Sequence, residues 1–283
     1  MNTSTIDQII RKALREDAVR QDVTTKLLIP AQSKAQASIT IKENAIVCGL
    51  SFAKKVFQAI DPAIKFKTVL KDGAAVKKGE TIITLQGKTQ SLLTGERCAL
   101  NFLSYLSGIA TKTHQFVKQA SGNRARILDT RKTTPGLRML EKYAVRCGGG
   151  ENHRLNLNEF VMIKDNHRTI CHPQLSIPES IALIREKTNK KITIEVDTLA
   201  QFQQALEGRP DIILLDNMIP TRMRKAVHLA RKMPVKQRPL LEASGGITLK
   251  NVAAIAKTGV DRISIGSLTH SHTSIDISME VFH

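Results

Sequence analysis

Seven charged side chains in this sequence have the types and the placement needed to bind a polyanionic ligand. The segment from Arg126 to Gly136 reads RILDTRKTTPG, an apolar run followed by two adjacent cations and a Pro-Gly turn. Desolvating Arg131 and Lys132 at the end of a buried strand is costly unless an anion pairs with them. Cations and acids also follow later apolar runs: His153, Arg154, Lys164, Glu195 and Asp216.

From about Arg126 onward, short apolar runs alternate with helical segments. The runs are RILD, FVMIKD, ITIEVD, DIILLD, PLLEASGG and RISIGS. Continuous Ile, Val and Leu in strands that alternate with helices are typical of a parallel sheet buried on both faces. We therefore predict an α/β fold with a (β/α) barrel domain, open or complete. In barrel enzymes the carboxyl ends of the strands carry the chemistry, so the charged residues are expected on one rim.

The last two runs end in glycine-rich steps that suit a phosphate group. Such turns let backbone N–H groups approach phosphate oxygens closely, and barrels commonly bind phosphate in the loops after their final strands. We expect Ser244, Gly245, Gly246 and Gly266 to surround a phosphate. The acids between the phosphate end and the cationic end suit a divalent metal or sugar hydroxyls.

Electrostatic magnitudes favour a bound polyanion over an internal ion-pair network. A pair of unit charges about 4 Å apart is worth roughly 4 kcal/mol at an effective dielectric constant of about 20, before desolvation is subtracted. Five cations with two acids leave several positive charges uncompensated. A structural ion-pair network explains any one of these residues, but it explains the whole set poorly.

The first part of the chain has a different pattern. ASITIKENAIVCGL alternates apolar and polar positions like a half-buried strand, and SLLTGERCALNFLSYLSGIATKTHQFVKQA is a long, apolar helical region. The final segment, SIDISMEVFH, alternates like a strand and is expected to return to the first sheet. We predict an N-terminal α+β sandwich domain at residues 1–110, completed by residues 272–283, and a barrel catalytic domain at residues 111–271.

Composition limits the function classes. The formal net charge is +18, which fits either nucleic-acid binding or a strongly anionic substrate; aromatic content of 4% and the absence of Trp disfavour base stacking. No apolar run reaches the roughly 20 residues of a membrane span. Four scattered cysteines without a Cys-x-x-Cys pair, and no signal-peptide pattern, favour a reducing compartment, and we expect the protein in the cytoplasm.

The motif LDTRKTTPGLRMLEKYAVRCGGGENHRLNLNEFVMIKDNH resembles the signature of the quinolinate phosphoribosyltransferases, the type II phosphoribosyltransferase family. Similar segments follow the family's order over essentially the whole chain, among them LLTGERCALNFLSYLSGIAT, IEVD, LLDNM, EASGGI and ISIGSLTHS. The resemblance implies transfer of ribosyl 5-phosphate from phosphoribosyl pyrophosphate to the ring nitrogen of quinolinate, followed by loss of CO2. Nicotinate mononucleotide and pyrophosphate would be the products, in a Mg²⁺-dependent step of NAD biosynthesis.

The resemblance also implies a role for each matching residue. The residues expected to bind quinolinate are Arg97, Thr130, Arg131, Lys132, His153, Arg154 and Lys164. The residues expected to bind phosphoribosyl pyrophosphate are Lys132, Lys164, Glu195, Asp216, Ser244, Gly245, Gly246 and Gly266. The catalytic residues would be Lys132, Lys164, Glu195 and Asp216, with Mg²⁺ held at Glu195 and Asp216 partly through the substrate.

Arg97 is expected to enter the site from the neighbouring subunit of a homodimer or larger assembly. An unpaired charge in its apolar helix would be costly, and the alternative is an intrachain salt bridge with Glu96 or Asp129. Two rival functions stay open: a ModD-type paralogue with a different acceptor, and an RNA-binding protein on a barrel scaffold. The sequence does not distinguish a dimer from a hexamer, fix the order of substrate binding or explain the high net charge.

Overall fold

The structure is a computed structural model that describes residues 3–171 and 175–282. The chain divides into two compact units. The first unit comprises residues 1–114, 139–149 and 271–283, and the second comprises residues 115–138 and 150–270.

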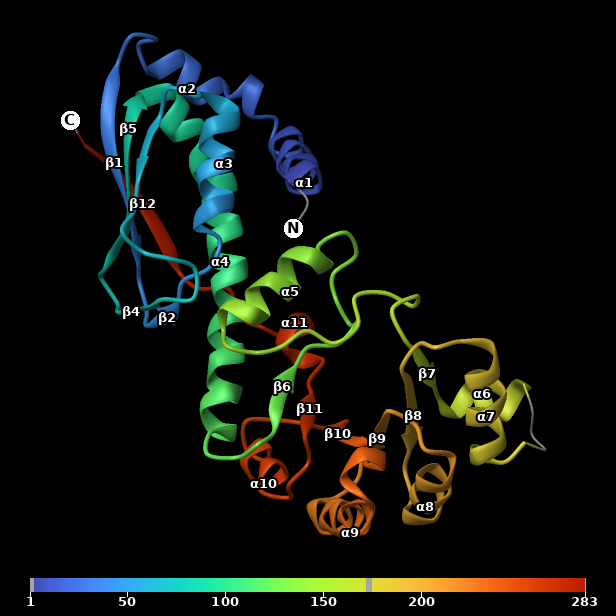
Figure 1. The fold of residues 1–283 in the computed structure, drawn as a ribbon. Coiled ribbons are helices and arrows are strands. Elements are labelled where there is room, and N and C mark those ends of the chain that lie inside the picture. The colour runs from blue at the N-terminus through green and yellow to red at the C-terminus, as the bar shows by residue number, and fades with distance from the viewer. Residues whose placement is uncertain (1–2, 172–174, 283) are drawn as a thin grey trace. The chain divides into compact units, whose positions relative to one another are not determined.

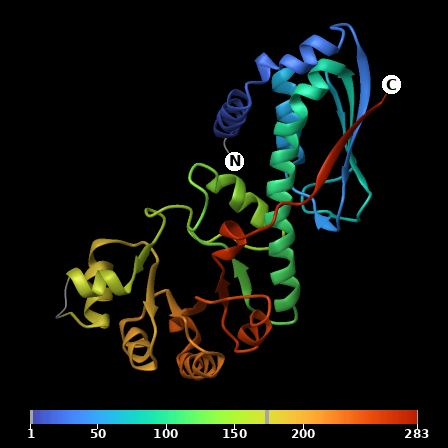
Figure 2. The same ribbon diagram turned by 180° about the vertical axis from the view of Figure 1, so that it is seen from behind.

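The first unit is built on a four-stranded antiparallel sheet with strand order β12-β1-β5-β3. Its strands are β1 (Lys34–Ile41), β3 (Lys65–Lys67), β5 (Thr81–Lys88) and β12 (Ile277–Phe282), and β2 (Ala45–Ile46) pairs with β4 (Ala75–Val76) in a separate ribbon. Figures 1 and 2 both show the C-terminal strand β12 running beside β1. The prediction that the C-terminal segment completes the first sheet is therefore confirmed.

Helices cover one face of this sheet (Figure 1). The helices of this unit are α1 (Thr3–Glu16), η1 (Val19–Gln21), α2 (Val23–Leu28), α3 (Leu50–Ile60), the first part of α4 (Thr89–Ala120) and most of α5 (Arg138–Cys147), and of these α3 and α4 lie against the sheet. Every second residue of β1 from Ala35 to Ile41 is buried, because alternate side chains of a strand point to the same face. These residues join Val56 and Phe57 of α3 and Leu103 of α4 in one core cluster.

The second unit contains a six-stranded parallel sheet with strand order β6-β11-β10-β9-β8-β7. The strands are β6 (Arg126–Leu128), β7 (Val161–Ile163), β8 (Ile192–Val196), β9 (Ile212–Asp216), β10 (Leu240–Ser244) and β11 (Arg262–Ser264). The helices are α6 (Asp165–Cys171), α7 (Ile177–Lys187), α8 (Leu199–Gly208), α9 (Pro220–Arg231), η2 (Val235–Gln237), α10 (Val252–Ala256) and α11 (Ser267–His270).

This sheet is an open barrel. Its end strands β6 and β7 do not pair with each other in the described residues, and the isolated bridge between Leu128 and Glu151 adds one more segment beside β6. All six apolar runs expected as strands form them, with helices between most of them. The fold prediction of a barrel domain plus an α+β domain is confirmed, in its open form.

The two compact units differ from the predicted domains mainly at residues 139–149; the other boundaries lie at 114/115 and 270/271, where 110/111 and 271/272 were predicted. Residues 139–149 belong to the first unit, whereas the sequence reading placed them in the barrel at 111–271. Local packing explains the assignment, because a Cβ on Gly148 would lie 2.3 Å from the carbonyl oxygen of Ala110 on α4. Helix α4 is continuous from Thr89 to Ala120 and therefore crosses the predicted boundary near residue 110.

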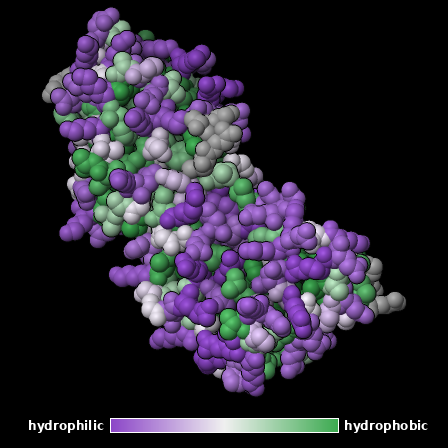
Figure 3. All heavy atoms as spheres, viewed as in Figure 1, coloured by the Kyte–Doolittle hydropathy of each residue, from purple (hydrophilic) through white to green (hydrophobic). Residues whose placement is uncertain are grey.

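Hydrophilic residues cover much of the visible surface, with scattered hydrophobic residues between them (Figure 3). Within the described ranges, no helix combines the length and the apolarity that crossing a membrane requires. Cys48, Cys98 and Cys147 are free thiols.

We predict that Ile277→Ala lowers the free energy of unfolding by about 2–4 kcal/mol, because it opens a cavity in a packed core. Ile277 pairs with Ile41 and is only 6% exposed. Urea denaturation of the whole chain measures the change. Val281→Ala, on the same strand at a residue that is 36% exposed, is the control and should cost less than about 1 kcal/mol. Equal, small effects of both substitutions would contradict the placement of β12 in the first core.

Candidate active site

A cleft of about 790 Å³ lies in the second unit. It is lined by twelve of the thirteen residues predicted as site residues: Thr130, Arg131, Lys132, His153, Arg154, Lys164, Glu195, Asp216, Ser244, Gly245, Gly246 and Gly266. They come from the carboxyl ends of the parallel strands and the segments that follow, as expected for a barrel rim. Residues more than 130 positions apart in the chain therefore meet in one cavity.

Asp129 holds the two cationic segments together at the end of β6. Its carboxylate accepts hydrogen bonds from the side-chain amide of Asn152 (2.6 Å) and the backbone N–H of His153 (2.8 Å). Because Asp129 is fully buried, these charge-assisted bonds fix the segment that leads to Arg154 beside the segment that carries Arg131. Asp129 thus has a structural role that the sequence reading missed.

The guanidinium of Arg131 has no partner among the described residues, and its Nε is buried. Its neighbour Lys132 is exposed; Thr130 Oγ1 accepts the Lys132 backbone N–H at 3.0 Å, and Thr269 donates to the Lys132 carbonyl oxygen. These backbone bonds fix the loop and leave both cationic groups available to a ligand.

Arg154 is 6% exposed and has no carboxylate partner within the described chain. It donates to the carbonyl oxygen of Phe160 (3.0 Å) and to the sulfur of Met162 (3.5 Å), and its guanidinium lies 5.4 Å from the Phe160 ring centroid. Burial, and next the nearby charge of Arg131, lower the pKa of Arg154. A group that lacks a counter-ion and stands beside a like charge would be stabilised by a bound anion.

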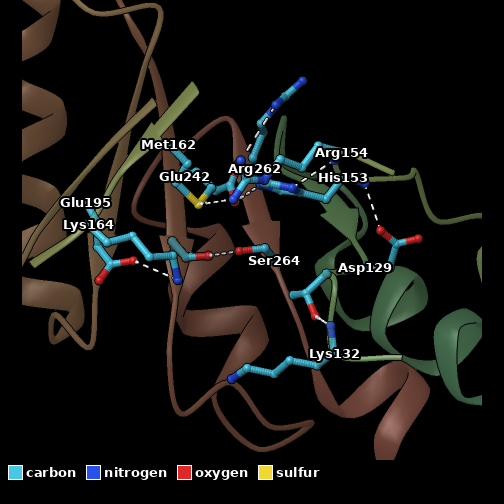
Figure 4. Close-up of polar contacts among 12 residues, drawn as sticks. Asp129, Lys132, His153, Arg154, Met162, Lys164, Glu195, Glu242, Arg262 and Ser264 are labelled. Atoms are coloured by element: carbon cyan, nitrogen blue, oxygen red, sulfur yellow. Dashed lines mark hydrogen bonds and ion pairs between the residues drawn. The ribbon is translucent and has the colours of Figure 1, made fainter. Parts of the chain in front are cut away.

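The two predicted acids lie on the neighbouring strands β8 and β9, and Glu195 of β8 lies beside Lys164, which directly follows β7 (Figure 4). Lys164 Nζ is 3.7 Å from Glu195 Oε2, a long ion pair with a half-exposed lysine. Burial raises the pKa of Glu195; the charge of Lys164 lowers it, and the charges of Asp216 and Asp165 raise it. Asp216 Oδ2 accepts a hydrogen bond from the Asn217 amide at 2.8 Å.

In the turn after β10, the backbone adopts positive φ angles that glycine tolerates and other residues rarely adopt. Gly245 and Gly246 have φ angles of +84° and +59°, and a Cβ on Gly245 would lie 2.2 Å from Asn217 Oδ1. The N–H groups of these two glycines have no acceptor among the described residues. Two unsatisfied donors that line the cleft suit a phosphate group.

Arg97 is the predicted site residue that does not line this cleft. It lies on α4 in the first unit, its side chain is exposed, and it makes no ion pair or hydrogen bond with described residues. The alternative considered from the sequence, an intrachain salt bridge with Glu96 or Asp129, is therefore not observed. The expectation that its charge would be buried in an apolar helix was wrong, because Arg97 lies on the exposed side of α4, where water solvates it.

The residues present fit a magnesium ion that is bound largely through a substrate. No group of three or more His, Cys, Asp or Glu residues that could hold a metal occurs in the described ranges. Mg²⁺ in phosphate-binding sites typically takes one or two carboxylates together with substrate phosphates and water. Glu195 and Asp216 provide two carboxylates that repel each other without a cation between them.

Sequence reasoning missed several residues that line the cleft. They are Met162, Leu214, Asn217, Glu242, Ile247, Thr248, Ser264, Ile265, Ser267 and His270. Glu242 could have been recognised from the sequence, because it is an acid within the otherwise apolar run PLLEASGG. The others carry no pattern that distinguishes them from ordinary loop and strand residues.

Both parts of the chain match models of one protein family. Residues 22–107 match the model described as quinolinate phosphoribosyl transferase, N-terminal domain, and residues 109–280 match the C-terminal domain of the same family.

Curated proteins and solved structures agree with this match. Proteins named probable nicotinate-nucleotide pyrophosphorylase (carboxylating) from Synechocystis sp. and Bacillus subtilis are 42% and 41% identical, over 98% and 99% of this chain and 92% and 95% of theirs. The structure of the nicotinate-nucleotide pyrophosphorylase from Francisella tularensis has a TM-score of 0.92 at 36% identity, covering 99% of this chain and 97% of that one. The enzyme of that name from Ehrlichia chaffeensis has a TM-score of 0.90 at 40% identity, covering 99% of each chain.

We predict that Glu195→Gln raises the melting temperature near neutral pH. Burial in the folded protein raises the pKa of Glu195, so folding favours its protonated form. The stabilisation from the protonated form is complete below the pKa of the unfolded chain and is lost as pH rises through the pKa of the folded protein. The ionised group therefore opposes folding near pH 7, and the uncharged amide does not. The advantage should shrink as pH falls through the raised pKa of folded Glu195, and it should be gone below the ordinary glutamate pKa of about 4.3, where the group is protonated in both states.

Thermal unfolding of both proteins across this pH range measures the effect. Glu207→Gln, at an exposed carboxylate on α8, controls for the change in net charge. A melting temperature of Glu195→Gln at or below that of the unsubstituted protein at pH 7 would show that Glu195 is not a strained, desolvated acid.

Proposed function

Because this chain belongs to the quinolinate phosphoribosyltransferase family, we propose that it transfers ribosyl 5-phosphate from phosphoribosyl pyrophosphate to quinolinate and releases CO2. The products are nicotinate mononucleotide and pyrophosphate, in the biosynthesis of NAD. The observation that carries the proposal is the pair Arg131 and Arg154, a half-buried arginine with a buried Nε and a buried arginine, which lie in one cleft and make no ion pair with a carboxylate of the described chain. Quinolinate, a pyridine with two adjacent carboxylates, supplies the missing negative charge.

The cationic end of the cleft binds the acid. Arginine suits planar carboxylates because its guanidinium can form two parallel hydrogen bonds with them. Arg131 and Arg154 bind the ring carboxylates, Lys132 and Lys164 lie within reach of both substrates, and Thr130 and His153 complete the pocket wall. The turn at Ser244, Gly245 and Gly246, together with Gly266, binds the 5-phosphate.

The reaction begins when the ring nitrogen of quinolinate attacks the anomeric carbon of the ribose. The bond from that carbon to the pyrophosphate oxygen breaks, and positive charge develops on the sugar. A carboxylate close to the sugar stabilises this charge, and Glu195 and Asp216 are the acids in the cleft that serve this role. Bound Mg²⁺, held at Glu195 and Asp216 partly through the substrate, would neutralise charge on the leaving pyrophosphate.

Decarboxylation follows on the quaternised ring. The bond between the ring carbon next to nitrogen and its carboxylate breaks, and the electron pair stays on that carbon, where the positive nitrogen stabilises it. A proton then replaces the lost CO2. The protein's contribution is orientation: Arg131 and Arg154 hold the ring through its carboxylates while the chemistry proceeds.

The comparisons support this function over both rivals. The relatives bear the names of the quinolinate enzyme, and neither a ModD-type acceptor nor RNA binding gains support from them.

We predict that Arg131→Ala lowers kcat/KM at least about 100-fold, because removing a charge-assisted contact in a desolvated site typically costs about 2–5 kcal/mol. The assay is release of CO2 from carboxyl-labelled quinolinate, dependent on phosphoribosyl pyrophosphate and Mg²⁺. Arg224→Ala, at an exposed arginine on α9, is the matched control and should retain normal turnover. Near-normal turnover of Arg131→Ala would refute the assignment of Arg131 to the acid.

Arg97 tests whether the working site includes a second subunit. We infer that the exposed Arg97 of one chain enters the cleft of its neighbour, so that Arg97→Ala and Arg131→Ala are each nearly inactive alone. Mixed dimers, formed by unfolding and refolding the two variants together, contain one site with both arginines intact. In a random mixture half of the dimers are mixed, so about one quarter of normal activity should return. No recovery in demonstrably mixed dimers would place Arg97 in the site of its own chain, or in no site.

A further inference from the structure

Glu242 is a fully buried carboxylate on β10 that borders the cleft and has no role in the substrate contacts proposed above. Neither carboxylate oxygen has a hydrogen-bond partner within the described chain. Its stabilising neighbours are His153, whose Nε2 lies 3.2 Å from Oε1, and Arg262, whose Nη1 lies 3.8 Å from Oε2 (Figure 4). A carboxylate this deeply buried depends on such neighbours, because desolvation strongly disfavours an isolated charge.

The imidazole of His153 is engaged at both ring nitrogens. Nδ1 accepts the backbone N–H of Arg154 at 2.9 Å, so the ring proton lies on Nε2, the nitrogen that is 3.2 Å from Glu242 Oε1. The backbone N–H of His153 donates to Asp129. The ring is 9% exposed and packs against Phe160, with 5.2 Å between ring centroids.

The same contacts fix Arg154. Its backbone is bonded to the His153 ring, and its guanidinium stacks on Phe160 and donates to the Phe160 carbonyl oxygen. A change in the tilt or tautomer of the imidazole would therefore move the backbone from which Arg154 extends. The carboxylate of Glu242 favours one tautomer and one ring orientation.

We propose that Glu242 and His153 are positioning residues, which orient Arg154 toward the carboxylates of the acceptor. This inference rests on the proposed function and specifies how its acid-binding pocket is aligned. Glu242 acts through His153, and His153 acts through the Arg154 backbone. A guanidinium forms two parallel hydrogen bonds with a carboxylate only when the two planar groups are aligned. The binding of the acceptor by Arg154 therefore depends on the positions of His153 and Glu242.

The test measures KM for each substrate separately. Glu242→Gln has nearly the same shape as glutamate but lacks the charge that fixes the imidazole. We expect KM for quinolinate to rise about tenfold or more, since small misplacements of a binding group are costly, while KM for phosphoribosyl pyrophosphate changes less than about twofold. His153→Asn should produce the same pattern. Arg185→Gln, which removes an ion pair with Asp211 on the outside of the same unit, should change neither constant.

A double-mutant cycle with Arg154→Lys separates positioning from an independent role. Lysine lacks the planar fork that needs alignment, so Glu242→Gln should change KM for quinolinate less than about twofold in the Arg154→Lys background. If the two substitutions raise KM for quinolinate independently, so that their factors multiply in the double variant, the inference is wrong. It is also wrong if KM for quinolinate is unchanged in Glu242→Gln and His153→Asn. If Glu242→Gln does not fold, His153→Asn carries the same cycle. An unsubstituted protein that releases no CO2 from quinolinate would instead refute the proposed function.

Discussion

The constraint that governs this molecule is the presence in one cleft of two arginines, Arg131 and Arg154, that form no ion pair with any carboxylate of the described chain. Arg154 is almost fully buried and bonds only to a carbonyl oxygen and a thioether, and Arg131 has a buried, unpartnered Nε. The loss of hydration on both groups is not offset by any ion pair within the described chain. In the function proposed here, a bound anion with two carboxylates offsets this loss.

The two arginines lack an ion-pair partner because the nearby carboxylates of the fold interact with other groups. Asp129 accepts hydrogen bonds from Asn152 and His153, and Glu242 lies at ion-pair distance from His153 and Arg262. The acids Glu195 and Asp216 lie on the neighbouring strands β8 and β9, and Glu195 pairs with Lys164 after β7. Along the rim of the barrel, Arg131 and Arg154 are thus separated from the carboxylates of Glu195 and Asp216. The glycine-rich turn after β10 also lines the cleft. This separation supports the proposal that one cleft binds a dicarboxylic ring, a ribose and a phosphate in a row.

Much of the fold and of the cleft was predictable from sequence. Strands such as ITIEVD and DIILLD are continuous apolar runs, and their polar ends had to meet on one rim because parallel strands all run the same way. Two features were not predictable. The side of α4 on which Arg97 lies depends on packing around a long helix that is apolar on most sides. The contacts of Asp129 and Glu242 join residues distant in sequence, and no local pattern specifies them.

A crystal structure with quinolinate bound tests the central claim most directly. The account predicts that oxygens of the two ring carboxylates lie within hydrogen-bond distance of the guanidinium groups of Arg131 and Arg154, with the ring nitrogen facing the cleft between Glu195 and the glycine turn. If the acid instead binds elsewhere while these arginines pair with carboxylates of the protein, the cleft is complete without a ligand and the account is wrong.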